Sequence, residues 1–159
     1  EYLPESYLMM NMDILVYNGK VVSYFCHLKE GSERFTHWFN GVMVRTPKMK
    51  EIAERFVSFA KDIGNLKTGL INPEFMIAPN GDVYFIECNF RYSGTMSYPW
   101  ALFRYDLIDE FLRAFHNVEP ESIRLPARMY KSYKNLEQQW EVQPWLKKKI
   151  DPKTVTILC

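Results

Sequence analysis

This sequence of 159 residues contains few cysteines, almost no net charge and no long apolar run. Its three cysteines, at positions 26, 88 and 159, are widely spaced and include no C-x-x-C pair. This argues against a disulfide framework or a zinc site and favours reduced thiols in a cytoplasmic protein. A net charge of +1 gives no electrostatic reason to expect nucleic acid or a membrane as a partner. No apolar run approaches the ~20 residues of a transmembrane helix, and no signal peptide is recognisable.

The sequence also lacks an initiator methionine and opens on Glu1, already in strand-like sequence. We therefore expect a piece of a longer protein. Apolar and aromatic residues are abundant, at 47% and 16% of the chain, which is ample for a sizeable core. The length fits one domain or a large part of a bigger one.

Two Asn-Gly pairs predict two β-hairpins. Asn18-Gly19 lies within the strand-like range 9–25, and Asn80-Gly81 lies within the range 70–91. Such a pair is typical of a two-residue type I′ turn, because both central residues must take a positive φ. In the first hairpin, this turn predicts one face that carries Asn11, Asp13, Leu15, Val22, Tyr24 and Cys26. Asp13 would then face solvent, cap a neighbour or line a site.

Two amphipathic helices are predicted beside the hairpins. Thr46 and Pro47 suit the N-cap and first position of a helix that ends at Gly64. Its apolar stripe at helical spacing is Met49, Ile52, Ala53, Phe56, Phe59, Ala60 and Ile63. A second helix is expected over 105–115, after a loop over 92–104. Short strands are expected at 41–45, 127–133 and 154–158.

The order hairpin, helix, hairpin, helix predicts an α+β fold, in which an antiparallel β-sheet has helices packed on one face. We assign residues 1–116 to this unit and residues 117–159 to a C-terminal extension without an assigned role.

The register of the second hairpin brings two acids together. If Asn80-Gly81 is a two-residue turn, Glu74 lies opposite Glu87 and Asn72 lies opposite Asn89. Alternation along the strands then predicts a polar face of Asn72, Glu74, Met76, Phe85, Glu87, Asn89 and Arg91. Like charges opposed across a ladder are destabilising, so we expect a positive group between the two acids.

The chemistry of this polar face suits a phosphate-binding site. Glu74, Glu87 and Asn89 offer only oxygen ligands, which a hard cation such as Mg²⁺ prefers. The planar guanidinium of Arg91 suits phosphate or carboxylate, and adenine could rest on Met76 and Phe85. The alternative is an ordinary polar strand face in contact with water.

Around this hairpin the sequence resembles the ATP-grasp enzymes, which are ATP-dependent carboxylate–amine ligases and their carboxylase relatives. That family has an acid on one strand, then a hairpin whose second strand ends in E-x-N-x-R. Here Glu74 precedes the turn, and Glu87, Asn89 and Arg91 follow it in this spacing. The segment 1–22 also resembles the family's hinge. The resemblance implies that residues 1–116 form the C-terminal half of an ATP-grasp fold.

The resemblance further implies the roles of individual residues. Glu74, Glu87 and Asn89 would hold two Mg²⁺ ions, with Mn²⁺ as an alternative, that bridge the phosphates of ATP. Arg91 would be the catalytic residue, in contact with phosphate or with an acyl phosphate.

The same resemblance implies a nucleotide-binding set. Glu1 and the backbone near Leu3 would lie beside the adenine and ribose, and Met76 would lie under the adenine. Asn11 would lie on the strand that borders the site.

The leading hypothesis is part of an ATP- and Mg²⁺-dependent ligase that activates a small carboxylate as an acyl phosphate for attack by an amine or similar nucleophile. The family's glycine-rich loop and phosphate-binding lysines belong to an N-terminal lobe that this sequence does not contain, so the chain alone is expected to be inactive. The alternatives are a non-catalytic nucleotide-binding or interaction module that retains the fold, and a plain α+β domain. A homo-oligomer is compatible with the sequence.

Overall fold

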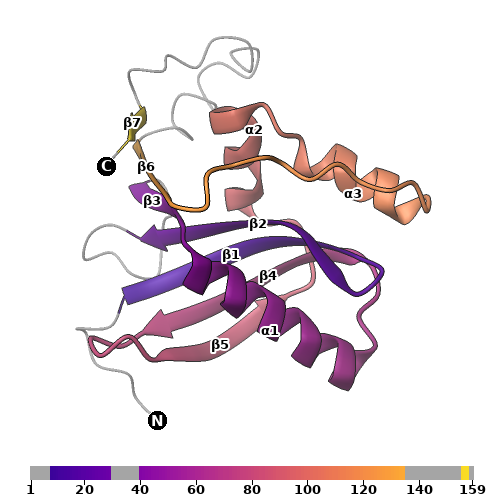
Figure 1. Ribbon diagram of the computed structural model, residues 1–159, viewed down its shortest axis with the longest axis horizontal. Helices are drawn as coiled ribbons and strands as arrows, with labels where there is room; N and C mark the ends of the chain where they lie inside the picture. Colours follow the sequence, from indigo (N-terminus) through magenta and orange to yellow (C-terminus); the bar gives the residue numbers. More distant parts are fainter. Residues whose placement is uncertain (1–7, 30–39, 135–154, 158–159) are drawn as a thin grey trace.

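The computed structural model describes residues 8–29, 40–134 and 155–157, which form one antiparallel sheet and several helices (Figure 1). The strands are β1 (Leu8–Tyr17), β2 (Lys20–Lys29), β3 (Asn40–Arg45), β4 (Gly69–Ile77), β5 (Val83–Asn89), β6 (Met129–Lys134) and β7 (Val155–Ile157). The helices are α1 (Pro47–Gly64), the 3-10 turn η1 (Gly94–Ser97), α2 (Tyr98–Phe103) and α3 (Leu107–Phe115). Within the described ranges the sheet has seven strands in the order β5-β4-β1-β2-β3-β6-β7. The α+β class is therefore confirmed.

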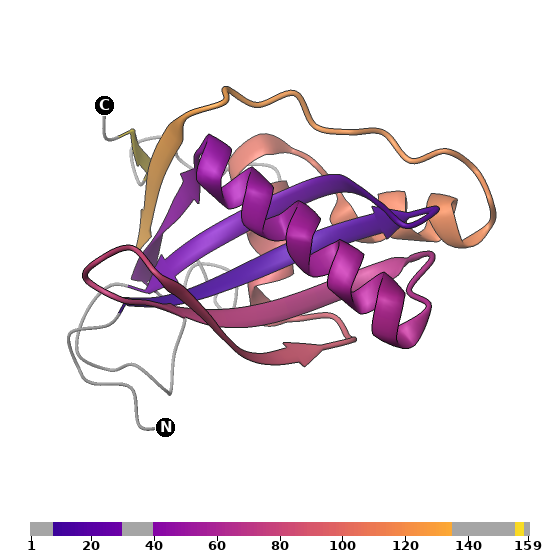
Figure 2. The same cartoon turned by 60° about the horizontal axis from the view of Figure 1, so that its bottom comes forward.

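The helices cover both faces of the sheet, where the sequence predicted one. Helix α1 lies on one side, and α2 and α3 lie on the other (Figures 1 and 2). The α1 face packs around Met12, Ile14 and Phe56, and the opposite face packs around Leu15, Phe25 and Tyr98. Successive residues of β1 point to opposite faces and are nearly all buried, so both faces of the central strand need a cover. No helix among the described residues is long and apolar enough to cross a membrane.

Helix α1 begins as predicted. Thr46 Oγ1 accepts a hydrogen bond from the Met49 amide at 3.2 Å, and Pro47 occupies the first turn. The helix also ends at Gly64 as predicted, but the residue that takes the left-handed conformation is Asn65, at φ 52°, and not the glycine. The side of α1 that faces the sheet consists of Ile52, Ala53, Phe56, Val57 and Ala60. Two members of the predicted stripe, Phe59 and Ile63, are instead exposed.

The first hairpin has the predicted turn but a different register. Asn18 and Gly19 both have positive φ, as a type I′ turn requires. Val16 pairs with Val21, but Leu15 pairs with Ser23, so Val22 is an extra residue in a β-bulge. The bulge exchanges the two faces of β2 beyond it. The predicted grouping of Asn11, Asp13 and Leu15 with Tyr24 and Cys26 is therefore wrong: Tyr24 and Cys26 pack on the α1 face.

The second hairpin reaches the predicted acid pair by another route. The loop has three residues, because the Ala78 amide donates to the Asp82 carbonyl at 2.8 Å, and only Gly81 has positive φ. The predicted two-residue turn, which would pair Pro79 with Asp82, is therefore wrong. A bulge at Ile86 then adds one residue to β5 and restores the register, so Glu74 does oppose Glu87.

The chain after β5 contains more structure than the sequence indicated. The range 92–104 was expected to be a loop, but η1 and α2 lie within it. Helix α3 begins at Leu107, because the Asp106 side chain caps the amides of Ile108 and Asp109. Strand β6 pairs with β3 and β7 pairs with β6, so these two strands within 117–159 extend the same sheet.

A substitution at Gly19 tests the turn of the first hairpin. Gly19 has φ +70°, and a Cβ there would lie 3.2 Å from Lys61 Cδ. We expect Gly19→Ala to lower the free energy of unfolding by about 1–2 kcal/mol, since an L-residue is strained in this conformation. The matched control is Gly64→Ala in α1, where a Cβ meets nothing within 4 Å and alanine is neutral or stabilising. Urea unfolding of both variants measures the difference, and equal midpoints would contradict the turn assignment.

Candidate functional site

Polar side chains form two adjacent rows across the sheet, on the face that also carries Leu15 and Phe25. The first row follows one line of paired residues across four strands: His27, Asn11, Glu74 and Glu87. The second row lies two residues along each strand, on the same face, and contains Asp13, Asn72 and Asn89. We call these residues the polar rows. Their inner part lies on β2 and β1, and their outer part lies on β4 and β5.

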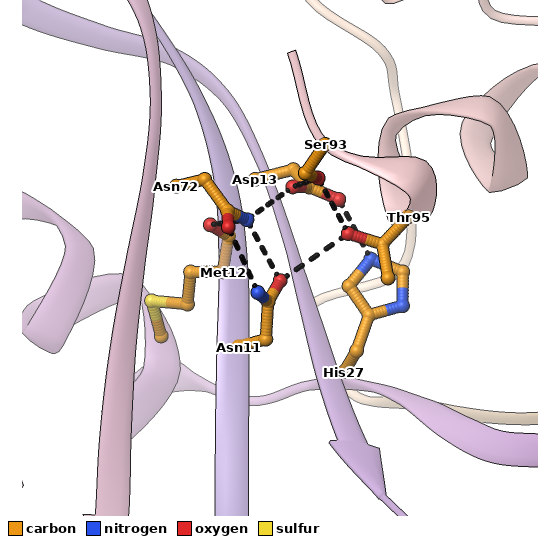
Figure 3. Close-up of polar contacts among 7 residues, drawn as sticks. All are labelled: Asn11, Met12, Asp13, His27, Asn72, Ser93 and Thr95. Atoms are coloured by element: carbon orange, nitrogen blue, oxygen red, sulfur yellow. Dashed lines mark hydrogen bonds and ion pairs between the residues drawn. The ribbon is translucent and has the colours of Figure 1, made fainter. Parts of the chain in front are cut away.

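The inner part of the polar rows is a buried carboxylate–imidazole pair (Figure 3). His27 Nε2 lies 3.1 Å from Asp13 Oδ2, and both side chains are 0% exposed. The other oxygen, Asp13 Oδ1, accepts hydrogen bonds from Asn72 Nδ2 at 2.7 Å and from Ser93 Oγ at 2.9 Å. A buried carboxylate is tolerated only when partners replace water, and Asp13 has two hydrogen-bond donors at Oδ1 and the imidazole of His27 at Oδ2.

Two buried amides continue the network toward the outer strands. Asn11 and Asn72 donate to each other's side-chain oxygens at 3.0 and 2.9 Å, and Asn72 also donates to the Met12 carbonyl. Thr95 Oγ1 donates to Asn11 Oδ1 at 3.3 Å, and Ser93 Oγ lies 2.8 Å from Thr95 Oγ1. The segment after β5 is thus bonded to β1 at two positions (Figure 3).

The outer part of the polar rows carries the two acids. Burial raises the pKa of Glu74, and the charge of Glu87 raises it further, while a hydrogen bond from Asn11 and the charge of Arg91 oppose the change. Asn89 Nδ2 donates to Glu87 Oε1 at 3.0 Å, which leaves the Asn89 oxygen as an acceptor. The predicted metal ligands Glu74, Glu87 and Asn89 are therefore neighbours on one face.

This donor set fits a hard cation. Among the described residues, no three His, Cys, Asp or Glu side chains gather as a metal-binding group. A cation here would rely on two carboxylates and one amide oxygen, and Mg²⁺ commonly takes one or two carboxylates and completes its shell with other oxygens. Burial is the first cause of the raised pKa of Glu74, and the charge of the neighbouring Glu87 is the second.

The other predicted site residues are placed as follows. Arg91 lies two residues beyond the end of β5, is exposed, and donates through Nη1 to the Tyr92 carbonyl at 3.3 Å. Met76 is buried and pairs with Tyr84. Phe85 contacts Phe56 and Phe75 on the α1 face, so the predicted adenine platform of Met76 with Phe85 is wrong. The bulge at Ile86 is the cause. Residues 1–7, which include Glu1 and Leu3, lie outside the described residues.

Sequence reasoning missed three members of the network: Ser93 and Thr95, which lie in the range expected to be a loop, and His27. A regular hairpin would place His27 on the other face of the sheet from Asp13, whereas the bulge at Val22 brings His27 to the same face. The clue in the sequence was Asp13 itself, since a carboxylate at the centre of an apolar strand needs a positive or donor partner.

Comparison with solved structures identifies the fold. The chain superimposes on the biotin carboxylase domain of Hydrogenobacter thermophilus 2-oxoglutarate carboxylase, with TM-score 0.58, 21% identity, and coverage of 83% of this chain and 30% of that one. It is similarly close to purK, N5-carboxyaminoimidazole ribonucleotide synthetase (TM-score 0.59, 14% identity, 83% and 35% coverage). An L-amino acid ligase from Bacillus licheniformis also matches (TM-score 0.55, 14% identity, 80% and 33% coverage).

All three of these proteins are ATP-grasp enzymes, and the first two structures are ADP complexes. The described residues thus have the fold of an ATP-grasp subdomain, and the chain spans about a third of the length of these structures. No protein-family profile and no curated protein sequence matches the chain.

The acid pair makes stability depend on pH. The folded-state pKa of Glu74 is raised, so its ionisation destabilises the folded chain as pH rises through the range above its unfolded value. We expect Glu74→Gln to stabilise the metal-free chain at pH 7–8 by up to about 1 kcal/mol. This gain should vanish near pH 4, where the wild-type carboxyl is also neutral.

Urea unfolding at several pH values without divalent cations measures this effect. The control is Glu119→Gln, which removes an exposed acid far from Glu87 in the sequence and should show no comparable gain. A Glu74→Gln gain that is the same at pH 4 and pH 8 would contradict the electrostatic origin.

Proposed function

We propose that this chain, which has the fold of an ATP-grasp subdomain, forms the C-terminal part of the ATP site of a longer, Mg²⁺-dependent ligase. The observation that carries the proposal is the register of β4 and β5. It sets Glu74 against Glu87, places Asn89 beside them and leads directly to Arg91. The similarity to ATP-grasp enzymes supports a nucleotide as the ligand of this face.

In this proposal the outer part of the polar rows holds the metal and the phosphates. Glu74, Glu87 and Asn89 would bind two Mg²⁺ ions, or Mn²⁺ in their place. Bound there, the cations would neutralise phosphate charge and align the terminal phosphoryl group. Arg91 would bind the transferring phosphate or the acyl phosphate, because its planar guanidinium matches such oxygens.

The nucleotide would lie along the same face. Met76, which is buried two residues beyond Glu74, would pack under the adenine, and Asn11 would border the site through its contact with the first acid. We propose Glu1 and the backbone near Leu3 for the adenine and ribose on the strength of the sequence resemblance alone.

The reaction proposed is activation of a small carboxylate. The terminal phosphoryl group of ATP would pass to a carboxylate oxygen, giving ADP and an acyl phosphate, and an amine or similar nucleophile would then displace phosphate. This chain contributes charge and alignment more than proton transfer. The remaining wall of the site, with phosphate-binding lysines and a glycine-rich loop, would come from an N-terminal lobe. We propose residues 1–116 as the subdomain unit and the cytoplasm as its location.

Titration of the full-length protein tests this proposal. We expect a non-hydrolysable ATP analogue to bind only when Mg²⁺ or Mn²⁺ is present, and Glu87→Gln to weaken this binding by roughly tenfold or more, since one carboxylate ligand is lost. The control is Asp62→Asn, an exposed acid on α1, which should leave affinity unchanged. Isothermal titration calorimetry gives both numbers.

Two results would contradict the proposal: no nucleotide binding by the full-length protein, or binding that is indifferent to Glu87→Gln. Binding without ligase turnover would instead support the non-catalytic module as the function.

A further inference from the structure

We propose that the buried His27–Asp13 pair is a positioning device that fixes the segment 91–97 against β1, and thereby sets where Arg91 lies relative to Glu74 and Glu87. The inference rests on the proposed function for the roles of Arg91 and the acids, and on the described contacts for everything else.

The pair first fixes the carboxylate. His27 lies on β2 opposite Asn11, and Asn11 is two residues before Asp13 on β1. Its Nε2 lies 3.1 Å from Asp13 Oδ2, and neither side chain is exposed to solvent. The ring of His27 also packs against Tyr98 in α2, with 5.8 Å between ring centroids. The carboxylate plane is thus held between two strands and the helix above them.

The fixed carboxylate then holds the segment that follows Arg91. Asp13 Oδ1 accepts from Ser93 Oγ at 2.9 Å, and Ser93 is only two residues beyond Arg91. Ser93 is also the N-cap residue of η1, and its carbonyl accepts from the Met96 amide at 3.1 Å. Anchoring Ser93 therefore defines both the path of the chain leaving β5 and the start of η1.

The same carboxylate is linked to the acid pair. Asn72 donates to Asp13 Oδ1 at 2.7 Å and exchanges hydrogen bonds with Asn11. Asn11 pairs with Glu74 across β1 and β4, and its side-chain amide lowers the pKa of the Glu74 carboxyl group. One buried group therefore connects the Arg91 segment on one side and Glu74 on the other, with one or two side chains in each path.

A role in stability alone does not account for this arrangement. Replacing a buried ion pair by apolar residues of similar size is often neutral or stabilising, because the pair must be desolvated. What an apolar pair could not supply is directional bonds to Ser93 and Asn72. This is the reason to assign the pair to positioning.

Native-state hydrogen exchange of the chain tests the proposal without any nucleotide. The probe is the Met96 amide, which is buried and bonded to Ser93. We expect Ser93→Ala to accelerate its exchange at least roughly tenfold, as the loss of one buried charge-assisted hydrogen bond implies. Asp13→Asn should do the same, because an amide cannot replace both carboxylate oxygens.

The matched control is Ser23→Ala. It removes another serine hydroxyl on the same face of the sheet, one that lies 2.6 Å from Tyr105 Oη. If Met96 exchange rises equally in Ser93→Ala and Ser23→Ala, or in neither, the pair is merely structural and the proposal is overturned.

A double-mutant cycle in the full-length protein tests the consequence for Arg91. The ligand is a non-hydrolysable ATP analogue with Mg²⁺. Ser93→Ala and Arg91→Ala should weaken its binding non-additively, because Ser93→Ala already moves Arg91 out of its binding position. Additive losses overturn the link to Arg91. If the parent protein binds no nucleotide, the proposed function fails, and the exchange experiment still decides whether the pair positions the segment.

Discussion

The structure depends on how a buried carboxyl group finds its partners in the interior of a β-sheet. Asp13 lies on β1, between β2 and β4 in the sheet, where no solvent reaches its side chain. Leaving such a group without partners would cost several kcal/mol. Its partners come from β2, β4 and the segment after β5, so three separate parts of the chain meet at one side chain. Satisfying Asp13 fixes their relative positions.

Local signals in the sequence predicted most of the elements. The cap at Thr46, the turn at Asn18-Gly19 and the alternation of the strands are short-range features, and the structure has them. The helix α2 was missed because Ser, Gly and Pro before and within it are typical of loops. Helices on both faces were missed because strand alternation shows which residues share a face and does not show what covers that face.

The prediction brought together the acids of the outer part of the polar rows and left His27 out of the inner part, and two bulges explain both results. The pairing of Glu74 with Glu87 was predicted from a two-residue turn that the structure does not have. The pairing is nevertheless correct, because the longer loop and the extra residue at Ile86 cancel. At Val22 nothing cancels, so Tyr24 and Cys26 were assigned to the face of Asp13, which Phe25 and His27 share instead. The position of a bulge depends on packing on both faces of the sheet, and the residue alternation along one strand does not reveal that packing.

The cancellation at Ile86 decides which side chain of β5 packs beneath α1. A two-residue turn without a bulge would oppose the two acids just as the three-residue loop with a bulge does. Only the second arrangement turns Phe85 toward Phe56 and Phe75, because the bulge reverses the faces of the residues between it and the turn. The bulge thereby adds an aromatic contact beneath α1 without disturbing the acid pair on the opposite face.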